Sequence, residues 1–173
     1  MRVGITGHQK RDGIEWGWVR SQIDLVVTGL PRPVIGYTSL AVGADQVFAS
    51  SLLDHGANLT AVIPIPNYEA FFDGEGLNLY RSLLNKADQV QLPGNEGDDQ
   101  EAFFRAGLYV AKHSDLVIAV WDEQEAKGHG GTADVVRYCE DQRIPLIIIN
   151  PIKQSVSSAP YKAAAANGLP KKQ

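Results

Sequence analysis

The chain has 173 residues, 44% of them hydrophobic and 21% charged, which is the length and apolar content of one compact domain with its own core. Sixteen basic residues stand against 20 acidic ones, and the net charge of -4 disfavours duplex nucleic acid and anionic membranes as partners. The sequence shows no signal-peptide pattern and no apolar run of membrane-spanning length, and its single cysteine cannot form an internal disulfide. A cytoplasmic location is therefore expected.

Short β-branched runs alternate with longer amphipathic stretches, which is the pattern of parallel strands joined by crossover helices. Six strands are predicted, at Val3–Thr6, Val34–Thr38, Leu59–Ile65, Gln89–Leu92, Asp115–Trp121 and Pro145–Asn150. Five helices are predicted between them, at Ile14–Val27, Gly43–His55, Leu77–Lys86, Asp99–His113 and Gly131–Asp141. Most of the strands are apolar almost throughout, as expected when helices cover both faces of a sheet. The predicted fold is an α/β, Rossmann-like three-layer sandwich with a mainly parallel sheet.

A single Rossmann-like nucleotide-binding domain is predicted over residues 1–151. After Pro151 the sequence turns to small and polar residues that lack the apolar face of a packed helix, so residues 152–173 are predicted to form a loosely ordered tail. The segment Gly94–Asp99, rich in glycine and acidic residues, is predicted to be a surface loop.

In an open parallel sheet, ligands bind beyond the carboxyl ends of the strands, so a site is expected in the loops that follow them. The first such loop contains Gly7 and His8. The glycine allows the backbone to turn sharply or to approach a ligand, and the histidine after it can contact that ligand. Alternatively, Gly7 only makes the turn and His8 lies in solvent.

The second loop, from Ser39 to Asp45, follows a strand and opens a helix, so its N–H groups and the positive end of the helix dipole would point at the crevice. The candidate ligand-binding residues here are Ser39, Gly43, Ala44 and Asp45. The alternative is that Ser39 or Asp45 merely caps the helix. The chain has no Gly-x-Gly-x-x-Gly match in this loop and no Gly-Lys-Ser/Thr element, which argues against a standard dinucleotide dehydrogenase and a P-loop NTPase.

The third loop runs from Asp122 to Asp134 and carries the most specific local signal. The candidate ligand-binding residues are Asp122, Gly130, Gly131 and Thr132, because the glycines let the main chain approach a phosphate at a helix N-terminus. Asp134 has two explanations. An acid in the first helical turn is stabilised by the helix dipole, and it could also bind a ribose hydroxyl or perform acid–base work.

Two further candidates lie outside these loops. Pro64 stiffens the chain that leaves the third predicted strand and offers an apolar wall, where Tyr68 could stack on a base or cover the edge of the core. Arg105 could reach over the sheet to a phosphate or remain solvated. The four histidines are scattered, so no metal site is predicted and no cofactor is expected beyond Mg²⁺ accompanying a nucleotide.

The segments Gly4 to His8, Ser39 to Asp45 and Gly130 to Thr132 together resemble the SLOG superfamily of Rossmann-like proteins. That group includes the LOG phosphoribohydrolases and the nucleic-acid-processing DprA proteins, and the resemblance spans about residues 2–151, as in a small stand-alone member. It implies that the phosphate is bound by Arg105, Gly130, Gly131 and Thr132. It also implies that Asp134 stands where phosphoribohydrolases place an acidic residue near the glycosidic bond.

Three functional hypotheses follow. The first is a module that binds or senses a nucleotide or nucleotide-derived small molecule and needs no catalytic base. The second is hydrolysis of the N-glycosidic bond of a nucleoside 5′-monophosphate, with Asp134 and Arg105 as the catalytic residues. The family motif Pro-Gly-Gly-x-Gly-Thr-x-Glu-Glu is only partly present, which places this hypothesis second. The third is DprA-like nucleic-acid handling, which needs a basic groove. A homo-oligomer is expected only by analogy with the family.

Overall fold

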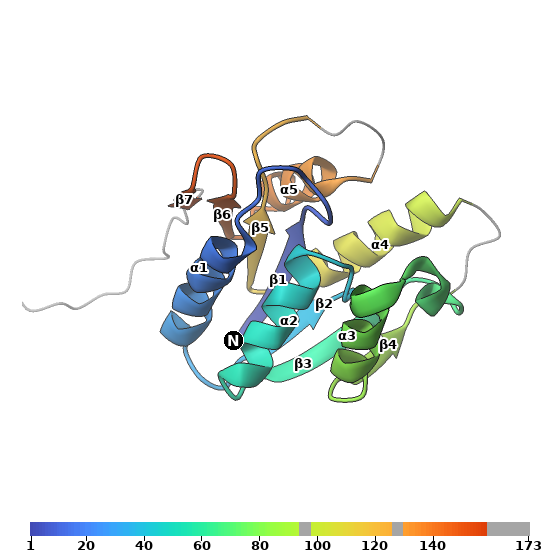
Figure 1. Ribbon diagram of the computed structural model, residues 1–173. Helices are drawn as coiled ribbons and strands as arrows, with labels where there is room; N and C mark the ends of the chain where they lie inside the picture. Colours follow the sequence, from blue (N-terminus) through green and yellow to red (C-terminus); the bar gives the residue numbers. More distant parts are fainter. Residues whose placement is uncertain (94–97, 126–129, 159–173) are drawn as a thin grey trace, which may run out of the picture.

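One sheet of seven strands, in the order β4-β3-β2-β1-β5-β6-β7, forms the middle layer of the domain (Figure 1). The computed structural model describes residues 1–93, 98–125 and 130–158. The first six strands pair in parallel, whereas β7 is antiparallel to β6. The strands are β1 (Arg2–Gly7), β2 (Ile35–Thr38), β3 (Asn58–Ile63), β4 (Asp88–Gln91), β5 (Leu116–Val120), β6 (Leu146–Asn150) and β7 (Ser155–Ser158).

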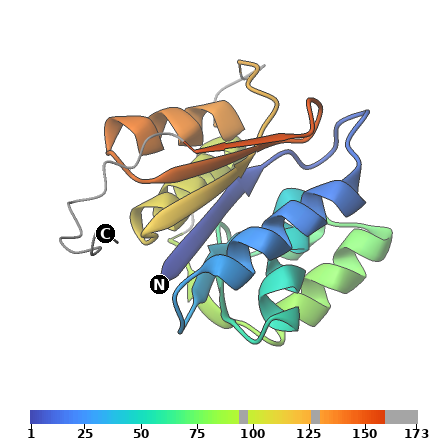
Figure 2. The same ribbon diagram turned by 90° about the vertical axis from the view of Figure 1, so that its left-hand side faces the viewer.

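Helices cover both faces of this sheet, as Figures 1 and 2 show. The helices are α1 (Trp16–Gly29), α2 (Ala44–Asp54), α3 (Gly74–Leu84), α4 (Asp99–Lys112) and α5 (Thr132–Asp141), with a short 3-10 helix, η1 (Tyr68–Phe71). α1, α2 and α3 lie on one face, and α4 and α5 lie on the other. The predicted three-layer α/β fold is therefore confirmed.

The direction in which the sheet grows reverses at β1. Strands β2 to β4 follow on one side of β1, while β5 and β6 lie on the other side. Crossovers on opposite faces leave a crevice at such a reversal, beyond the carboxyl ends of the two central strands. The topology thus places the ends of β1 and β5 at the expected binding position.

Apolar side chains fill both layers between helices and sheet. Val19, Ile23 and Val27 recur every fourth residue of α1, so they share one helical face and are fully buried in the core on that side. On the opposite side, Val135 and Val136 of α5 pack with residues of β5 and β6. Within the described residues, no helix is long and apolar enough to cross a bilayer.

The structure differs from the sequence prediction at two places. The seventh strand lies inside the segment that was predicted to be loosely ordered; Ser155–Ser158 pairs with β6 although its side chains are exposed and show no apolar pattern. Backbone hydrogen bonds to β6 define this strand, and no pattern of residue types predicts them. The second difference follows β3, where η1 was not predicted and α3 begins at Gly74 rather than Leu77. Residues 159–173 of the predicted tail lie outside the described residues.

Candidate functional site

An open crevice of about 1600 Å³ lies beyond the carboxyl ends of the central strands. Its walls come from the loops after β1, β2, β3 and β5, from η1 and α4, and from the first turn of α5. Several residues predicted from the sequence line it, namely Gly7, His8, Ser39, Asp45, Pro64, Asp122, Gly130, Gly131 and Thr132. Tyr68 lines it as well. The loops identified in the sequence therefore converge on one cavity.

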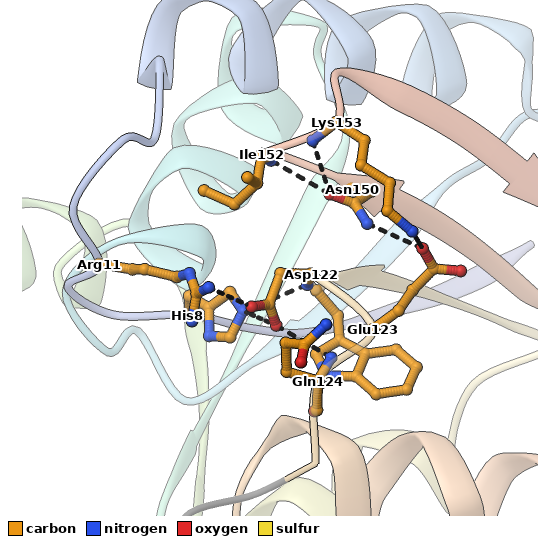
Figure 3. A network of polar contacts seen from close by, with 9 residues as sticks. His8, Arg11, Asp122, Glu123, Gln124, Asn150, Ile152 and Lys153 are labelled. Carbon is orange, nitrogen blue, oxygen red and sulfur yellow. Dashed lines mark hydrogen bonds and ion pairs between the residues drawn. The ribbon is translucent and has the colours of Figure 1, made fainter.

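A buried carboxylate joins the loops after β1 and β5. The Asp122 side chain is only 3% exposed, and its Oδ1 lies 3.0 Å from Nε2 of His8. Arg11 Nη2 lies 2.6 Å from Oδ2, as an ion pair rather than an aligned hydrogen bond. Figure 3 shows the side chains of His8 and Arg11 approaching Asp122 from the loop after β1. We call His8, Arg11 and Asp122 the polar wall of the crevice.

The partners of Asp122 keep it ionised. Burial by itself would raise the pKa of this carboxyl group, but several contacts act in the opposite direction. The Gln124 N–H and the His8 ring bond to the carboxylate, and the charge of Arg11 favours its ionised form. Together these contacts outweigh desolvation and hold the pKa below its ordinary value.

A second polar network fixes the loop that carries Asp122. Glu123, which has a positive φ of 63°, accepts hydrogen bonds from Asn150 Nδ2 at 2.9 Å and from Lys153 Nζ at 2.8 Å. The Asn150 side chain also accepts the N–H groups of Ile152 and Lys153, which shapes the turn between β6 and β7 (Figure 3). The end of β6 and the turn that follows it therefore help to position the polar wall.

The loop after β2 folds around its own carboxylate. Asp45 Oδ2 accepts hydrogen bonds from Thr38 Oγ1 at 2.8 Å and from the Ser39 N–H at 2.9 Å. Burial raises the pKa of Asp45 to about 6, because these neutral donors only partly offset the cost of desolvation. The Ser39 N–H of the predicted anion site therefore already donates to the Asp45 carboxylate of the same loop.

Two predicted residues of this loop, Gly43 and Ala44, do not line the crevice. Gly43 has a φ of 95°, and a Cβ there would lie 2.5 Å from the Gln9 carbonyl oxygen, so only glycine fits. The Ala44 N–H donates to the His8 carbonyl at 3.1 Å. The structure gives both residues a packing role, holding the loops after β1 and β2 together, and ligand contact by them remains a prediction.

An aromatic wall, made by Tyr68, Phe71, Phe72 and Phe103, faces the crevice from η1, the residue after it, and α4. Tyr68 is 6% exposed and packs edge-on against Phe72 and Tyr80, so it mainly covers the core edge, one of the two alternatives drawn from the sequence. Phe71 is 51% exposed and meets Phe103 edge-on. The aromatic ring offered to a ligand is therefore that of Phe71.

The N-terminus of α5 forms the third side of the crevice. Gly130 has a φ of 87°, and its N–H donates to Asp134 Oδ2 at 2.7 Å. The other oxygen of Asp134 pairs with Arg137 Nη1 at 3.2 Å. The Asp134 N–H already donates to the Gly131 carbonyl oxygen at 3.0 Å. The N–H groups of Thr132 and Ala133 have no acceptor among the described residues, so these two remain for a ligand. Gly128 and His129, part of the predicted glycine segment, lie outside the described residues.

Two residues required by the hydrolase hypothesis do not line the crevice. Asp134 turns its carboxylate to Gly130 and Arg137, which is the structural alternative noted from the sequence. Arg105 lies on α4, and its Nε is buried without a hydrogen-bond partner among the described residues. The structure does not bring these two side chains into the cavity with the Gly131 and Thr132 backbone.

Arg11, Phe71 and Phe103 are among the crevice residues that sequence reasoning missed. The two consecutive cations Lys10 and Arg11, which follow His8 after one intervening residue, were the available signal for a polar wall. The aromatic wall was signalled by Phe71 and Phe72, three and four residues after Tyr68. Among the described residues, the structure contains no group of three or more His, Cys, Asp or Glu side chains that could hold a metal ion.

No protein-family model and no curated protein matches this chain in sequence. Solved structures do match its fold. DNA processing protein A (DprA) from Streptococcus pneumoniae superposes with a TM-score of 0.64 at 17% identity, over 86% of this chain and 50% of DprA. DprA from Helicobacter pylori, whose structure concerns a single-stranded DNA binding mode, superposes with a TM-score of 0.64 at 12% identity, over 87% and 65% of the two chains.

The fold is DprA-like. This finding confirms the fold implied by the SLOG resemblance. The Moco carrier protein of Chlamydomonas reinhardtii shares the fold more distantly, with a TM-score of 0.51 at 16% identity over 85% of this chain and 74% of that protein. This chain spans half of one DprA and about two thirds of the other. At these identities the likeness establishes the fold alone. The same fold occurs in a DprA that binds single-stranded DNA and in a Moco carrier protein.

Proposed function

We propose that this protein binds a nucleotide or nucleotide-derived small molecule in the crevice, as a binding or sensing module. The observation that carries the proposal is the pairing of an exposed aromatic ring with a helix N-terminus in one cavity. A planar base can lie on Phe71, and a phosphate can accept hydrogen bonds from the first turn of α5. Gly131 and Thr132 are the residues proposed for that phosphate, and any Mg²⁺ would enter with it.

The charge of the crevice favours a small ligand with few phosphates. Its lining contains Lys10 and Arg11, and against them the carboxyl groups of Asp12, Asp45, Asp122 and Glu125. Arg11 is already paired with Asp122. Over the described residues, this surface lacks the excess of cations needed to bind along the backbone of a single strand of nucleic acid. A nucleoside monophosphate or a related compound suits it better than a polyphosphate or DNA.

The proposal is tested by calorimetric titration of the full chain with nucleoside 5′-monophosphates, nucleotide sugars and dinucleotides. Saturable binding of at least one compound is expected. Phe71→Ala should weaken that binding about 5- to 100-fold, because stacking of a base on an aromatic side chain contributes about 1–3 kcal/mol. The matched control is Leu25→Ala on α1, where the side chain is 67% exposed and far from the crevice lining.

Two results would count against this function. One is the absence of saturable binding for every compound while the protein remains folded. The other is tight binding of single-stranded DNA that weakens steeply with salt, which would support a DprA-like partner instead.

A further inference from the structure

His8 makes two contacts with Asp122 that require opposite states of the same nitrogen. Nε2 lies 3.0 Å from the carboxylate Oδ1, which needs a proton on Nε2, and 3.3 Å from the Asp122 backbone nitrogen, which needs a lone pair there. A neutral imidazole carries one proton, on Nε2 or on Nδ1. The ring therefore has two possible tautomers in this site, and each offers a different group to the crevice.

Electrostatics selects between them. Asp122 is ionised, and an unprotonated Nε2 would place a nitrogen lone pair 3.0 Å from a charged oxygen. The contact with the backbone N–H is longer and lacks the assistance of a charge. Arg11, 2.6 Å from Oδ2, occupies the other side of the carboxylate and leaves Oδ1 for the ring. The Nε2–H group of His8 therefore donates to Asp122.

The remaining ring nitrogen, Nδ1, is accessible. His8 lines the crevice and its side chain is 21% exposed. Among the described residues, the buried side-chain nitrogens and oxygens without a hydrogen-bond partner are Arg105 Nε and Asp122 Oδ2, so Nδ1 of His8 is not a buried orphan. Among the described residues, the His8 ring makes its hydrogen bonds through Nε2 alone (Figure 3).

We propose that Asp122 fixes His8 in the Nε2–H tautomer, so that Nδ1 serves as a hydrogen-bond acceptor for a hydroxyl or N–H group of the bound molecule. The part of this proposal that concerns the bound molecule rests on the proposed function. An unprotonated nitrogen repels phosphate oxygens and attracts the hydroxyl of a sugar. The polar wall thus contacts the sugar of a nucleotide, while the phosphate binds at the N-terminus of α5.

The tautomer is measured first, on the ligand-free full chain. Long-range ¹H–¹⁵N correlation spectra at pH 9, where a free imidazole is neutral, distinguish a protonated from an unprotonated ring nitrogen. The His8 signals are identified by their loss in His8→Gln. We expect the Nε2–H tautomer. The Nδ1–H tautomer would overturn the proposal, whether or not any nucleotide binds, so this result is independent of the proposed function.

Two substitutions separate the two nitrogens. In His8→Gln, the amide nitrogen can replace Nε2 and still donate to Asp122, but no atom stands at Nδ1. In His8→Asn, the amide can replace Nδ1 but does not reach Asp122. Matching amide spectra of both variants and the unmodified chain establish that each is folded. We expect His8→Gln to weaken binding about 2- to 10-fold, since that is the usual value of one hydrogen bond, and His8→Asn to weaken it less.

The final arm tests the sugar hydroxyl directly, with the four ribonucleoside 5′-monophosphates and their 2′-deoxy and 3′-deoxy forms. If Nδ1 accepts a hydrogen bond from one of these hydroxyls, removing that hydroxyl and substituting His8→Gln remove the same interaction. The two losses of binding free energy then do not add. Fully additive losses for both hydroxyls would refute the assignment to the sugar. Failure of all twelve compounds to bind would refute the assignment to the sugar of a nucleoside monophosphate. The tautomer would still decide the state of His8, and the wider set of nucleotide sugars and dinucleotides would still decide the proposed function.

Discussion

Two buried carboxyl groups in this crevice, Asp122 and Asp45, have pKa values that shift in opposite directions. Both lie at the carboxyl end of the sheet, and burial penalises the charged form of each. Asp122 has the cation Arg11 and the ring of His8 as partners, and its pKa falls. Asp45 is bonded to a hydroxyl and to backbone N–H groups, and its pKa rises to about 6.

The difference shows that neutral and charged partners give a buried carboxyl group different roles in this site. Neutral donors around Asp45 shape a rigid loop, in which Leu40 is fully buried with a φ of 60°. The cation Arg11 holds a full negative charge on Asp122 next to the ligand position, and this carboxylate orients His8. One carboxyl group is therefore structural, and the other is part of the binding surface.

The largest expected effect concerns the neutral donors. Asp45→Ala removes the acceptor for the Thr38 hydroxyl and the Ser39 N–H, whereas Asp45→Asn keeps an acceptor oxygen without the charge. Each buried donor left without a partner costs about 1–3 kcal/mol. We expect the alanine variant to be less stable than the asparagine variant by about 4 kcal/mol in urea denaturation. Equal stabilities would show that these hydrogen bonds do not hold the loop.

The second effect is the pH dependence of Asp45. Between about pH 4 and pH 6 its carboxyl group is protonated in the folded state but ionised in the unfolded state, so stability falls as the pH rises through this window. The displacement of the pKa to about 6 corresponds to about 3 kcal/mol. Urea denaturation at several pH values should give this decline in the unmodified chain relative to Asp45→Asn. Parallel curves for the two proteins would contradict a raised pKa.

The third effect is the pH dependence of stability due to Asp122, which has the opposite sign to that of Asp45. Because the pKa of Asp122 is lowered, the stability it contributes is present above the ordinary carboxyl pKa of about 4 and is lost as the pH falls through its folded pKa. Asp122→Asn should cost about 1 kcal/mol at pH 7, since Arg11 is partly exposed, and little near pH 2. The same denaturation series measures it. A loss of stability on Asp122→Asn that grows towards low pH would contradict a lowered pKa of Asp122.

The smallest effect is expected at Asp134. Asp134→Asn keeps an oxygen that can accept the Gly130 N–H and loses the ion pair with the exposed Arg137, which should cost less than about 1 kcal/mol. Nucleotide binding should persist. Mass spectrometry of nucleoside monophosphates incubated with both proteins checks the hydrolase hypothesis. Release of free base by the unmodified chain, abolished in this variant, would restore it.

The general architecture could be read from the sequence because its signals are local. The spacing of three and four residues between Val19, Ile23 and Val26 predicts the face of α1 that packs on the sheet, where Val19 and Ile23 are buried and Val26 is partly buried. Glycines mark where the loops turn towards the crevice. The pairing of Arg11 with Asp122 could not be predicted, because it depends on the adjacency of β1 and β5 in space. Neither could β7, which has no side-chain pattern, nor the exposure of Phe71 beside the buried Tyr68.

The central claim, that the crevice binds a nucleotide-like molecule, is tested most directly by following backbone amide resonances during titration with nucleoside 5′-monophosphates. We predict saturable shifts concentrated on His8 to Arg11, on Phe71, on Gln124 and on Gly130 to Thr132. Shifts concentrated elsewhere, for example along the exposed edge strand β4, would contradict the claim, as would spectra unchanged at saturating concentrations of every nucleotide.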